Sequence, residues 1–492
     1  AAKAAPGQAS SKVTFAIKED YLGLHVTGKA PAGTQELEWR VAHPGQAEPQ
    51  WSKAGAPAQD GGFAFDAALT AWPWERIELR ALRDGSVLAE AARQPAQRKF
   101  AMLTPERVAA LPQPEREAWT RYLESSDEKA RHERAVLAGE CRKLSLAASL
   151  PAPSNSAEFE LGSDKDEDWI RSGATQRLAD AVLSFQTPSG GWSKAVDYSA
   201  GPRQPGMQWT IDAGNPWHYC GTLDNRSTTE QIKFLAWVHH LTGREDAKAG
   251  SQRGIEWLLA AQYPNGGWPQ NYPVEPGYHE AITLNDDAML HALEVLQRVR
   301  DGEEYFAWVE RAVRERAGAA FARGLECLRA CQVRVDGKPT VWCAQHDPLS
   351  LEPVAARLKE PPSLSGSESA NLLKFLMRDG PLDAATIGMI EAGLEWLSAH
   401  RITGLRKVKN DAGKTDYIAD HASDEIYWAR FYDVQTAEPM FAGAQDGIVY
   451  KTFHEMAQHN KVGYDYFTTK PADVTGKEVE RWKKRIEKEG GR

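Results

Sequence analysis

The chain has 492 residues, more than one ordinary hydrophobic core accommodates, so its length predicts two or three domains. Its formal net charge is −9 and no run of Lys and Arg stands out, which excludes nucleic acid as a partner and attraction of a polyanion by the overall field. No run of about twenty apolar residues occurs, so we expect no membrane-spanning segment and no membrane partner.

The first hundred residues predict a small β domain behind a tail. Residues 1–12 begin AAKAAPGQASS, which is low in complexity and typical of a mature N-terminus after export. We therefore expect a flexible tail and a secreted protein of bacterial type, extracellular or periplasmic. Residues 13–100 alternate apolar and polar side chains at period two, and Asp84-Gly85 indicates a tight hairpin. This pattern favours a β-sandwich, which could bind carbohydrate or be a structural appendage.

Residues 101–164 predict a helical spacer and a linker. Thr104 followed by Pro105 is typical of a capped helix start, and a long stretch of helical period follows it. The segment PAPSNSAEFELGSDKDEDW is then rich in Pro, Ser and acidic residues, which is typical of a linker.

The remaining residues, 165–492, carry a repeated helix-and-loop unit. In its two clearest copies, LADAVLSFQTPSGGWSK and IEWLLAAQYPNGGWPQ, a helix ends in Gln and is followed by Pro, a small polar residue and Gly-Gly-Trp. With two degraded copies, the corresponding positions are Gln186, Gln262, Gln332 and Arg401. Helical hairpins of this kind bury their apolar faces only by stacking. We therefore predict a mainly α fold, an (α/α) toroid or incomplete barrel of helical hairpins, with the loops on one rim.

Two segments of this domain place carboxylates where a loop meets a helix. Asp224 precedes a predicted helix and could be its N-cap. In TLNDDAM, Asn285 is the better cap, which leaves Asp286 and Asp287 in the first helical turn. Calcium takes several oxygen ligands, and substrate carboxylates and water can complete a site that has few protein carboxylates. The residues alone therefore leave both capping and cation binding open.

A third segment places cations beside a helix start. Pro361 and Pro362 bar a helix there, so Arg357 and Lys359 are expected on a loop near the next helix. An ion pair with a neighbouring helix is the ordinary alternative for such an Arg. The histidines, among them His218 and His279, have no spacing typical of a metal site.

Taken in order, several motifs of residues 165–470 resemble those of the pectate lyases of polysaccharide lyase family ten. The motifs are GGWSK (190–194), LDNRSTTEQ (223–231), GIEWLLAAQYPNGGWPQ (254–270), YHEAITLNDDAM (278–289), WCAQHD (342–347), AARLKEPPSLSGSES (355–369), WARFYD (428–433) and QDG (445–447). The resemblance implies an (α/α) toroid with a substrate groove, in agreement with the repeat. It also implies cleavage of polygalacturonate or pectin by β-elimination, with Ca²⁺ as cofactor, and we expect a monomer.

The resemblance assigns roles to individual residues. The family's base is an arginine, and the matching position is Arg357; because arginine normally stays protonated, an alkaline optimum is expected. Asp224 and Asp286 would hold calcium, with Asp287 as a neighbour able to substitute. Further residues would contact substrate carboxylates and hydroxyls, and these are Asn225, Arg226, Lys194 and Lys359.

The chain departs from the family pattern at two places. Lys359 stands where family members usually have Tyr, within Ala356-Arg357-Leu358-Lys359-Glu360. Gln445 stands where they usually have Arg, which removes a cation expected to bind the polyanion. Substrate preference is therefore expected to differ, whereas the base and the calcium carboxylates are present.

Two other functions fit parts of the pattern. A pectin-binding toroid without catalysis would follow if the change at Gln445 disabled turnover. A terpene-cyclase-like toroid would also carry Gln and Trp repeats at Gln186–Trp192 and Gln262–Trp268, but the Asp-X-Asp-Asp acid of that class is missing from the sequence.

Overall fold

The computed structural model describes residues 12–19, 23–42, 50–68, 76–93, 102–154, 159, 165–212, 215–409, 415–462 and 464–489. The tail expected at residues 1–12, apart from Lys12, lies outside the described residues, as does most of the linker segment between residues 155 and 164. Within the described ranges, no helix combines the length and the apolar character that crossing a membrane requires.

Contacts divide the chain into two compact units. The first consists of Ala1–Thr222, Glu230–Trp257 and Asn271–Pro276. The second consists of Leu223–Thr229, Leu258–Gln270 and Gly277–Arg492.

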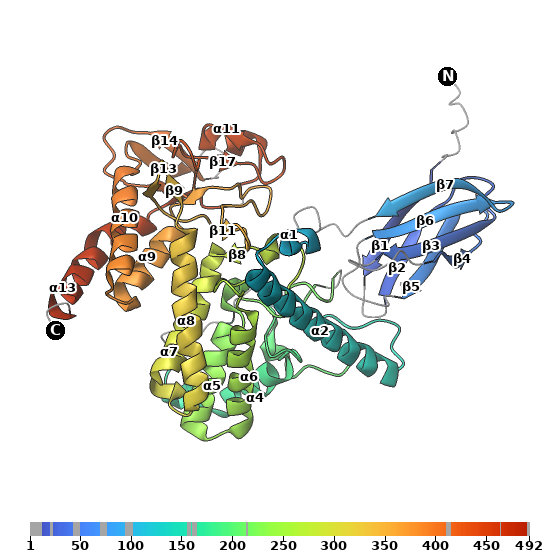
Figure 1. Cartoon of the computed structure of the whole chain (residues 1–492), viewed down its shortest axis with the longest axis horizontal. Coiled ribbons are helices and arrows are strands. Elements are labelled where there is room, and N and C mark those ends of the chain that lie inside the picture. The colour runs from blue at the N-terminus through green and yellow to red at the C-terminus, as the bar shows by residue number, and fades with distance from the viewer. Residues whose placement is uncertain are drawn as a thin grey trace. The chain divides into compact units, whose positions relative to one another are not determined.

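The described strands near the N-terminus form two antiparallel sheets, ordered β1-β2-β5 and β4-β3-β6-β7 (Figure 1). Their bounds are β1 Thr14–Glu19, β2 Gly23–Lys29, β3 Glu36–Ala42, β4 Ser52–Gly55, β5 Gly62–Ala68, β6 Arg76–Arg83 and β7 Ser86–Arg93. Apolar side chains of both sheets, such as Val26 and Leu79, share one core, which is the two-layer arrangement of a sandwich. Asp84 (φ 49°) and Gly85 (φ 72°) connect β6 to β7, because a tight hairpin needs such left-handed residues.

Two helices follow the sheets. Thr104 caps α1 (Pro105–Ala109), its hydroxyl accepting a hydrogen bond from the Arg107 N–H at 3.3 Å, as the sequence predicts. The long helix α2 (Gln113–Lys143) buries one face, and its Leu137 and Cys141 pack with Trp209 and Cys220. This helix is therefore part of a hydrophobic core of the first unit.

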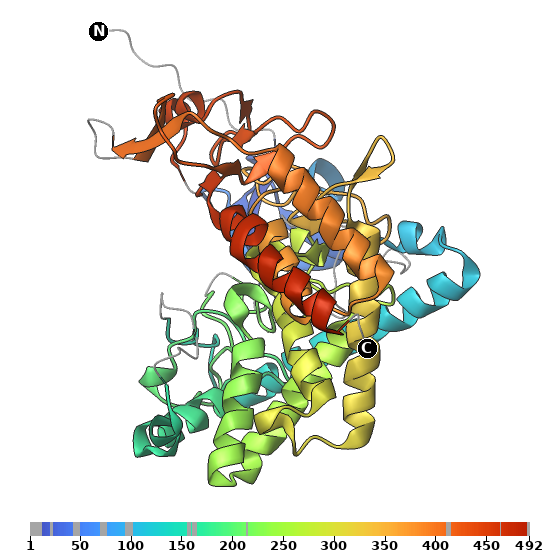
Figure 2. The same cartoon turned by 90° about the vertical axis from the view of Figure 1, so that its left-hand side faces the viewer.

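The rest of the chain is mainly helical. The α-helices are α3 Glu167–Arg171, α4 Gly173–Ser184, α5 Thr229–Thr242, α6 Glu245–Ala261, α7 Ala288–Asp301, α8 Arg311–Cys331, α9 Glu368–Asp379, α10 Ala384–Ala399, α11 Phe453–His459, α12 Lys470–Asp473 and α13 Val479–Glu489. Consecutive helices pack in pairs, and the yellow pair α7 and α8 lies side by side in both views (Figure 1, Figure 2). Each long helix buries an apolar face, which such pairing requires.

The four sequence copies share one buried hydrogen bond. In each, a Trp indole N–H donates to a backbone carbonyl in the last turn of the preceding helix, four positions before the corresponding Gln or Arg. The bonds join Trp192 to Val182 (2.7 Å), Trp268 to Leu258 (2.9 Å), Trp342 to Leu328 (2.8 Å) and Trp428 to Leu397 (2.7 Å). All these indoles are buried, so each bond satisfies a helix-end carbonyl that water cannot reach.

The glutamines of the first three copies connect each loop to a later helix. Gln262 donates from Nε2 to the carbonyls of Gly266 (3.0 Å) and Ala320 (2.8 Å) and accepts from Arg323. Gln186 and Gln332 make the same pair of donated bonds. In the fourth copy Arg401 is exposed, so only the indole bond of the unit is kept there.

The residues that the structure describes between 402 and 468 do not continue the helical pattern expected up to the C-terminus. They contain short strand pairs and one helix, packed around an aromatic cluster that includes Tyr427, Phe431, Phe441 and Tyr466. The other short strands are β8 Ile282–Thr283, β9 Arg334–Val335, β10 Lys338–Pro339, β11 Gln345–His346, β12 Leu364–Ser365, β13 Leu405–Lys409, β14 Thr415–Ala419, β15 Trp428–Ala429, β16 Phe431–Tyr432, β17 Phe441–Ala442, β18 Val449–Tyr450 and β19 Phe467–Thr468.

The buried glutamine bonds predict a stability effect. Gln262→Ala should lower the free energy of unfolding by about 1–3 kcal/mol, because two buried carbonyls lose their donor. Equilibrium unfolding in urea measures this difference. Gln252→Ala is the matched control, since Gln252 is only partly buried and pairs with Glu256 in its own helix. Equal losses in both variants would contradict a special role for Gln262.

Candidate active site

Three loops of the repeated unit begin with the same antiparallel β pairing. In each, the residue just before the loop pairs with the residue three positions after the Trp of the next copy. The pairs are Thr222 with Asn271, Thr283 with Gln345, and Ser365 with Phe431. By this register, Asn225, Asp286 and Glu368 occupy equivalent positions, each three residues after its paired strand residue.

The first of these loops carries Asp224. The Leu223 N–H donates to the Gln270 carbonyl at 2.9 Å, which fixes the start of the 3₁₀ turn η3 (Asp224–Arg226). Asn225 is left-handed (φ 50°, ψ 41°), a conformation that Asn tolerates better than most residues. Asp224 is buried and lies several positions before α5, so it is not the N-cap of that helix.

The second loop repeats this geometry. The Leu284 N–H donates to the Ala344 carbonyl at 2.8 Å, and Asp286 in η5 (Asn285–Asp287) is left-handed (φ 52°, ψ 28°) like Asn225. Asn285 does not cap α7 as expected; its amide donates to the Asp286 carboxylate at 2.6 Å. The strained turn places this Asn beside Asp286 and not in line with the helix axis.

Asp286 and Asp224 interact electrostatically. Burial raises the pKa of Asp286, and the negative charge of Asp224 raises it further, while Arg430 and Arg357 act in the opposite direction. The turns η3 and η5, which carry these two carboxylates, are in contact with each other. Carboxylate oxygens are ligands that calcium prefers, so Asp224 and Asp286 are the residues here that could hold this cation.

Asp287 has a different environment. Its carboxylate accepts from the Asn371 amide at 3.0 and 2.7 Å, which directs it toward α9. Burial raises its pKa to about 6, and the Asn371 hydrogen bond opposes this shift. The structure therefore separates Asp287, held by Asn371, from Asp286, which interacts with Asp224.

Arg357 lies on the expected loop and forms a bidentate ion pair with Glu360. Its Nε donates to Glu360 Oε2 at 2.9 Å and its Nη2 to Glu360 Oε1 at 2.6 Å, while Nη2 also contacts the Tyr464 hydroxyl. Burial disfavours the charge of Arg357, but Glu360 outweighs burial and holds the pKa of Arg357 above its ordinary value. The pKa of Arg357 also responds to Tyr464 and Tyr278.

Sequence reasoning missed Glu368 and Arg430. Arg430 donates to Glu368 Oε1 at 2.5 Å and to Asn285 Oδ1 at 3.2 Å, and its guanidinium lies 4.0 Å from Asp286. Glu368 is 4% exposed, so the ion pair stabilises a buried charge. Extending the repeat register to the third copy would have identified Glu368, and the motif WARFYD already contained Arg430.

Tyr464 was also missed, and it lies among the cations of the site. The Arg430 guanidinium is 4.1 Å from its ring centre and the Lys359 ammonium is 4.0 Å from it. Burial lowers the pKa of Lys359, and the nearby Arg357 charge lowers it further. Arg430 and Tyr464 also line a pocket of about 410 Å³, together with Thr415, Tyr417, Phe453, Val462, Asp465 and Tyr466.

The other predicted substrate residues have these positions. Asn225 and Arg226 lie in η3 beside Asp224. Lys194 belongs to the first unit, with its ammonium 3.5 Å from the Tyr219 ring centre. Gln445, the departure from the family pattern, donates its backbone N–H to Asn460 Oδ1 at 2.9 Å.

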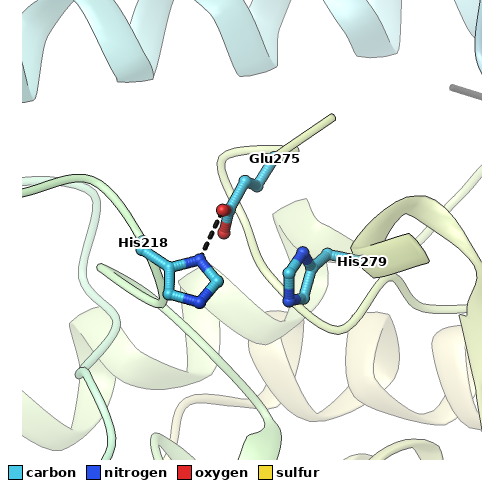
Figure 3. Close-up of side chains that lie close together, drawn as sticks. All are labelled: His218, Glu275 and His279. Carbon is cyan, nitrogen blue, oxygen red and sulfur yellow. Dashed lines mark hydrogen bonds and ion pairs between the residues drawn. The ribbon is translucent and has the colours of Figure 1, made fainter. Parts of the chain in front are cut away.

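Among the histidines, His218 contacts a buried carboxylate, that of Glu275. His218 Nδ1 lies 2.5 Å from Glu275 Oε1, both in the first unit (Figure 3). The two residues are 57 positions apart in the chain, so no local sequence pattern predicts this contact.

Comparisons with known proteins bear on this site. The profile of the family described as pectic acid lyase matches residues 186–475. Two solved structures of a family 10 polysaccharide lyase from Cellvibrio cellulosa are each 29% identical to this chain, with a TM-score of 0.55. One of them is a single-site variant in complex with trigalacturonic acid. The match covers 96% of that structure's chain and 95% of the other's, and in both cases 64% of this chain. No curated protein matches the chain.

The raised pKa of Asp287 predicts a pH-dependent stability. Above pH 6 the folded protein holds a charged, half-buried carboxylate that is better solvated in the unfolded chain, so the shift destabilises the fold there. Asp287→Asn should raise the free energy of unfolding at pH 8 by about 1–2 kcal/mol. The gain should vanish toward about pH 4, where the side chain is protonated in the folded state and increasingly so in the unfolded state.

Urea unfolding with chelator present measures this effect. Asp336→Asn is the control, because Asp336 lies on an exposed turn, and it should change the stability little at either pH. A gain for Asp287→Asn that is equal at both pH values would contradict the assignment.

Proposed function

This chain belongs to the pectic acid lyase family and is a polysaccharide lyase, and from that premise we propose that it is a calcium-dependent pectate lyase. It would cleave (1→4)-α-D-galacturonan by β-elimination. The observation that carries the proposal is that the turns bearing Asp224 and Asp286 are in contact, with the Arg430 guanidinium 4.0 Å from the Asp286 carboxylate. The printed ligand of one similar structure, trigalacturonic acid, is a fragment of this substrate.

Asp224 and Asp286 would hold the calcium ion. They offer carboxylate oxygens; burial is the main cause of the raised pKa of Asp286, the Asp224 charge raises it further, and a cation would favour the charged form of both. When bound, calcium supplies positive charge that stabilises the negative charge developing on the uronate carboxylate. Asp287 is a weaker candidate because Asn371 occupies its carboxylate.

Arg357 would act as the base. In its neutral form it takes the C5 proton, the electrons of that bond form the C4=C5 double bond, and the C4–O bond breaks. The leaving oxygen then takes a proton from solvent. Because the pKa of Arg357 lies above its ordinary value, the neutral form is scarce at neutral pH and the rate should rise with pH in the alkaline range.

Cations around the base would bind the polyanion. Lys359, Arg226 and Arg430 lie in the second unit with Arg357, and Asn225 adds an amide. Lys194 is assigned to substrate by the family resemblance alone. Because pectin is too large to enter a cell intact, we also propose export, with a monomeric (α/α) toroid as the catalytic body.

Replacement of the base tests this function. Arg357→Ala should lower kcat by about a thousandfold or more while KM changes little, since the lost interaction belongs to the transition state. Absorbance of the unsaturated product at alkaline pH measures turnover. Arg378→Ala is the matched control, because Arg378 also pairs with carboxylates, Asp379 and Glu294, and it should keep normal activity. Normal turnover by Arg357→Ala would eliminate Arg357 as the base; gel retention on pectin without turnover in the unmodified protein would indicate a pectin-binding protein.

Replacement of a calcium carboxylate gives a second test. Asp224→Ala should raise the calcium concentration needed for half-maximal rate at least about tenfold, because calcium affinity follows the ligand charge. The chelator-treated protein is titrated with calcium and assayed for unsaturated product. Asp420→Ala, at an exposed ion pair with Arg406, is the control. An unchanged calcium requirement in Asp224→Ala would remove Asp224 from the cation site.

A further inference from the structure

The carboxylate partner of Arg357 is fixed by the backbone. The Glu360 N–H donates to the Arg357 carbonyl at 2.8 Å, and the Ala356 N–H donates to the Glu360 carbonyl at 3.0 Å, which closes a tight turn. Glu360 Oε2 accepts from both the backbone N–H and the Nε of Arg357, each at 2.9 Å. The Glu360 side chain is only 2% exposed, so it meets the guanidinium in one orientation.

Tyr464 connects the two charged groups. Its hydroxyl donates to Glu360 Oε1 and accepts from Arg357 Nη2. A phenol has one proton to donate, so this arrangement uses both its donor and its acceptor capacity. Burial raises the pKa of Tyr464, which favours the protonated hydroxyl that donates to Glu360.

This arrangement has a specific consequence for a base. Neutral Arg357 becomes a guanidinium when it takes up a proton, and that charge appears next to a buried carboxylate. Resting on the proposed function, we infer that Glu360 and Tyr464 are positioning residues that orient Arg357 and stabilise the charge it acquires from the substrate C5 proton. Glu360 thus makes the neutral base scarcer at neutral pH but a stronger proton acceptor once it forms.

Other charged or titratable groups also face Arg357. Asp286 from η5 and Lys359 from the same loop interact with its charge, and Tyr278 faces it from the segment before β8. Lys359 opposes the guanidinium charge and Asp286 favours it. Glu360 has the largest favourable effect, because it combines two hydrogen bonds with direct charge contact.

Variants that separate charge from shape test the inference. Glu360→Gln keeps the size of the side chain but removes its charge, and Glu360→Asp keeps the charge. In Glu360→Gln the pH of half-maximal kcat should move about 1–3 units lower and the maximal kcat should fall, because an opposite charge shifts a pKa by that amount. In Glu360→Asp the midpoint should stay near that of the unmodified enzyme.

Tyr464→Phe tests the connecting hydroxyl and serves if Glu360→Gln does not fold. It keeps the ring beneath Arg430 and Lys359, so kcat should fall severalfold while KM for polygalacturonate stays unchanged. The matched controls are Glu425→Gln and Tyr427→Phe, a second tyrosine–glutamate pair, and both should leave the pH profile in place. A raised KM with unchanged kcat in Tyr464→Phe would overturn its positioning role.

Two results separate this inference from the proposed function. If the unmodified enzyme forms product and Arg357→Ala does not, an unshifted midpoint in Glu360→Gln overturns the inference alone. If the unmodified enzyme forms no product, the proposed function fails, and with it the role in proton uptake. In that case ¹⁵N NMR tests whether Glu360 orients Arg357, by measuring how fast the Arg357 Nε proton exchanges with water. Exchange should be slow in the unmodified protein and faster in Glu360→Gln. Equal exchange rates would overturn the positioning role of Glu360 as well.

Discussion

A buried indole N–H bonded to a helix-end carbonyl is the contact on which the site depends. Trp268 donates to the Leu258 carbonyl, and two residues after Trp268 the carbonyl of Gln270 accepts from the Leu223 N–H. Trp342 makes the same kind of bond, and two residues after it the carbonyl of Ala344 accepts from the N–H groups of Leu284 and Asn285. The loops that bear Asp224 and Asp286 are thus bonded to backbone segments that two buried tryptophans hold in place, and such a rigid frame can support strained loops.

The electrostatics of the second unit follow from this frame. Acidic residues of successive copies lie in one charged region, where Arg430 binds Glu368 and approaches Asp286. Arg357 comes from outside the repeated loops and has its own acid, Glu360. The site therefore combines acidic residues at repeated loop positions with Arg357, whose loop has no counterpart in the other copies.

Features that depend on a local sequence pattern could be predicted from the sequence alone. Period-two strands, the Asp84-Gly85 hairpin, the Thr104 cap and the repeat all depend on neighbouring residues, and the structure has them. The fork of Arg357 on Glu360 was invisible because a spacing of three in a loop does not define a contact. Tyr464 and Arg430 lie far from Arg357 in sequence, so only the folded chain brings them to it. Asn285 was expected as a cap because Asn favours that position, but the left-handed turn at Asp286 decides its direction.

The equivalence of Asn225, Asp286 and Glu368 has an evolutionary meaning. One backbone register presents a single side chain at each of these three positions, so the chemistry of a position can change while its loop stays intact. An amide, a short acid and a long acid already occupy the three places. New specificities can therefore arise in such a protein by exchanging one residue per duplicated unit, without any redesign of the scaffold.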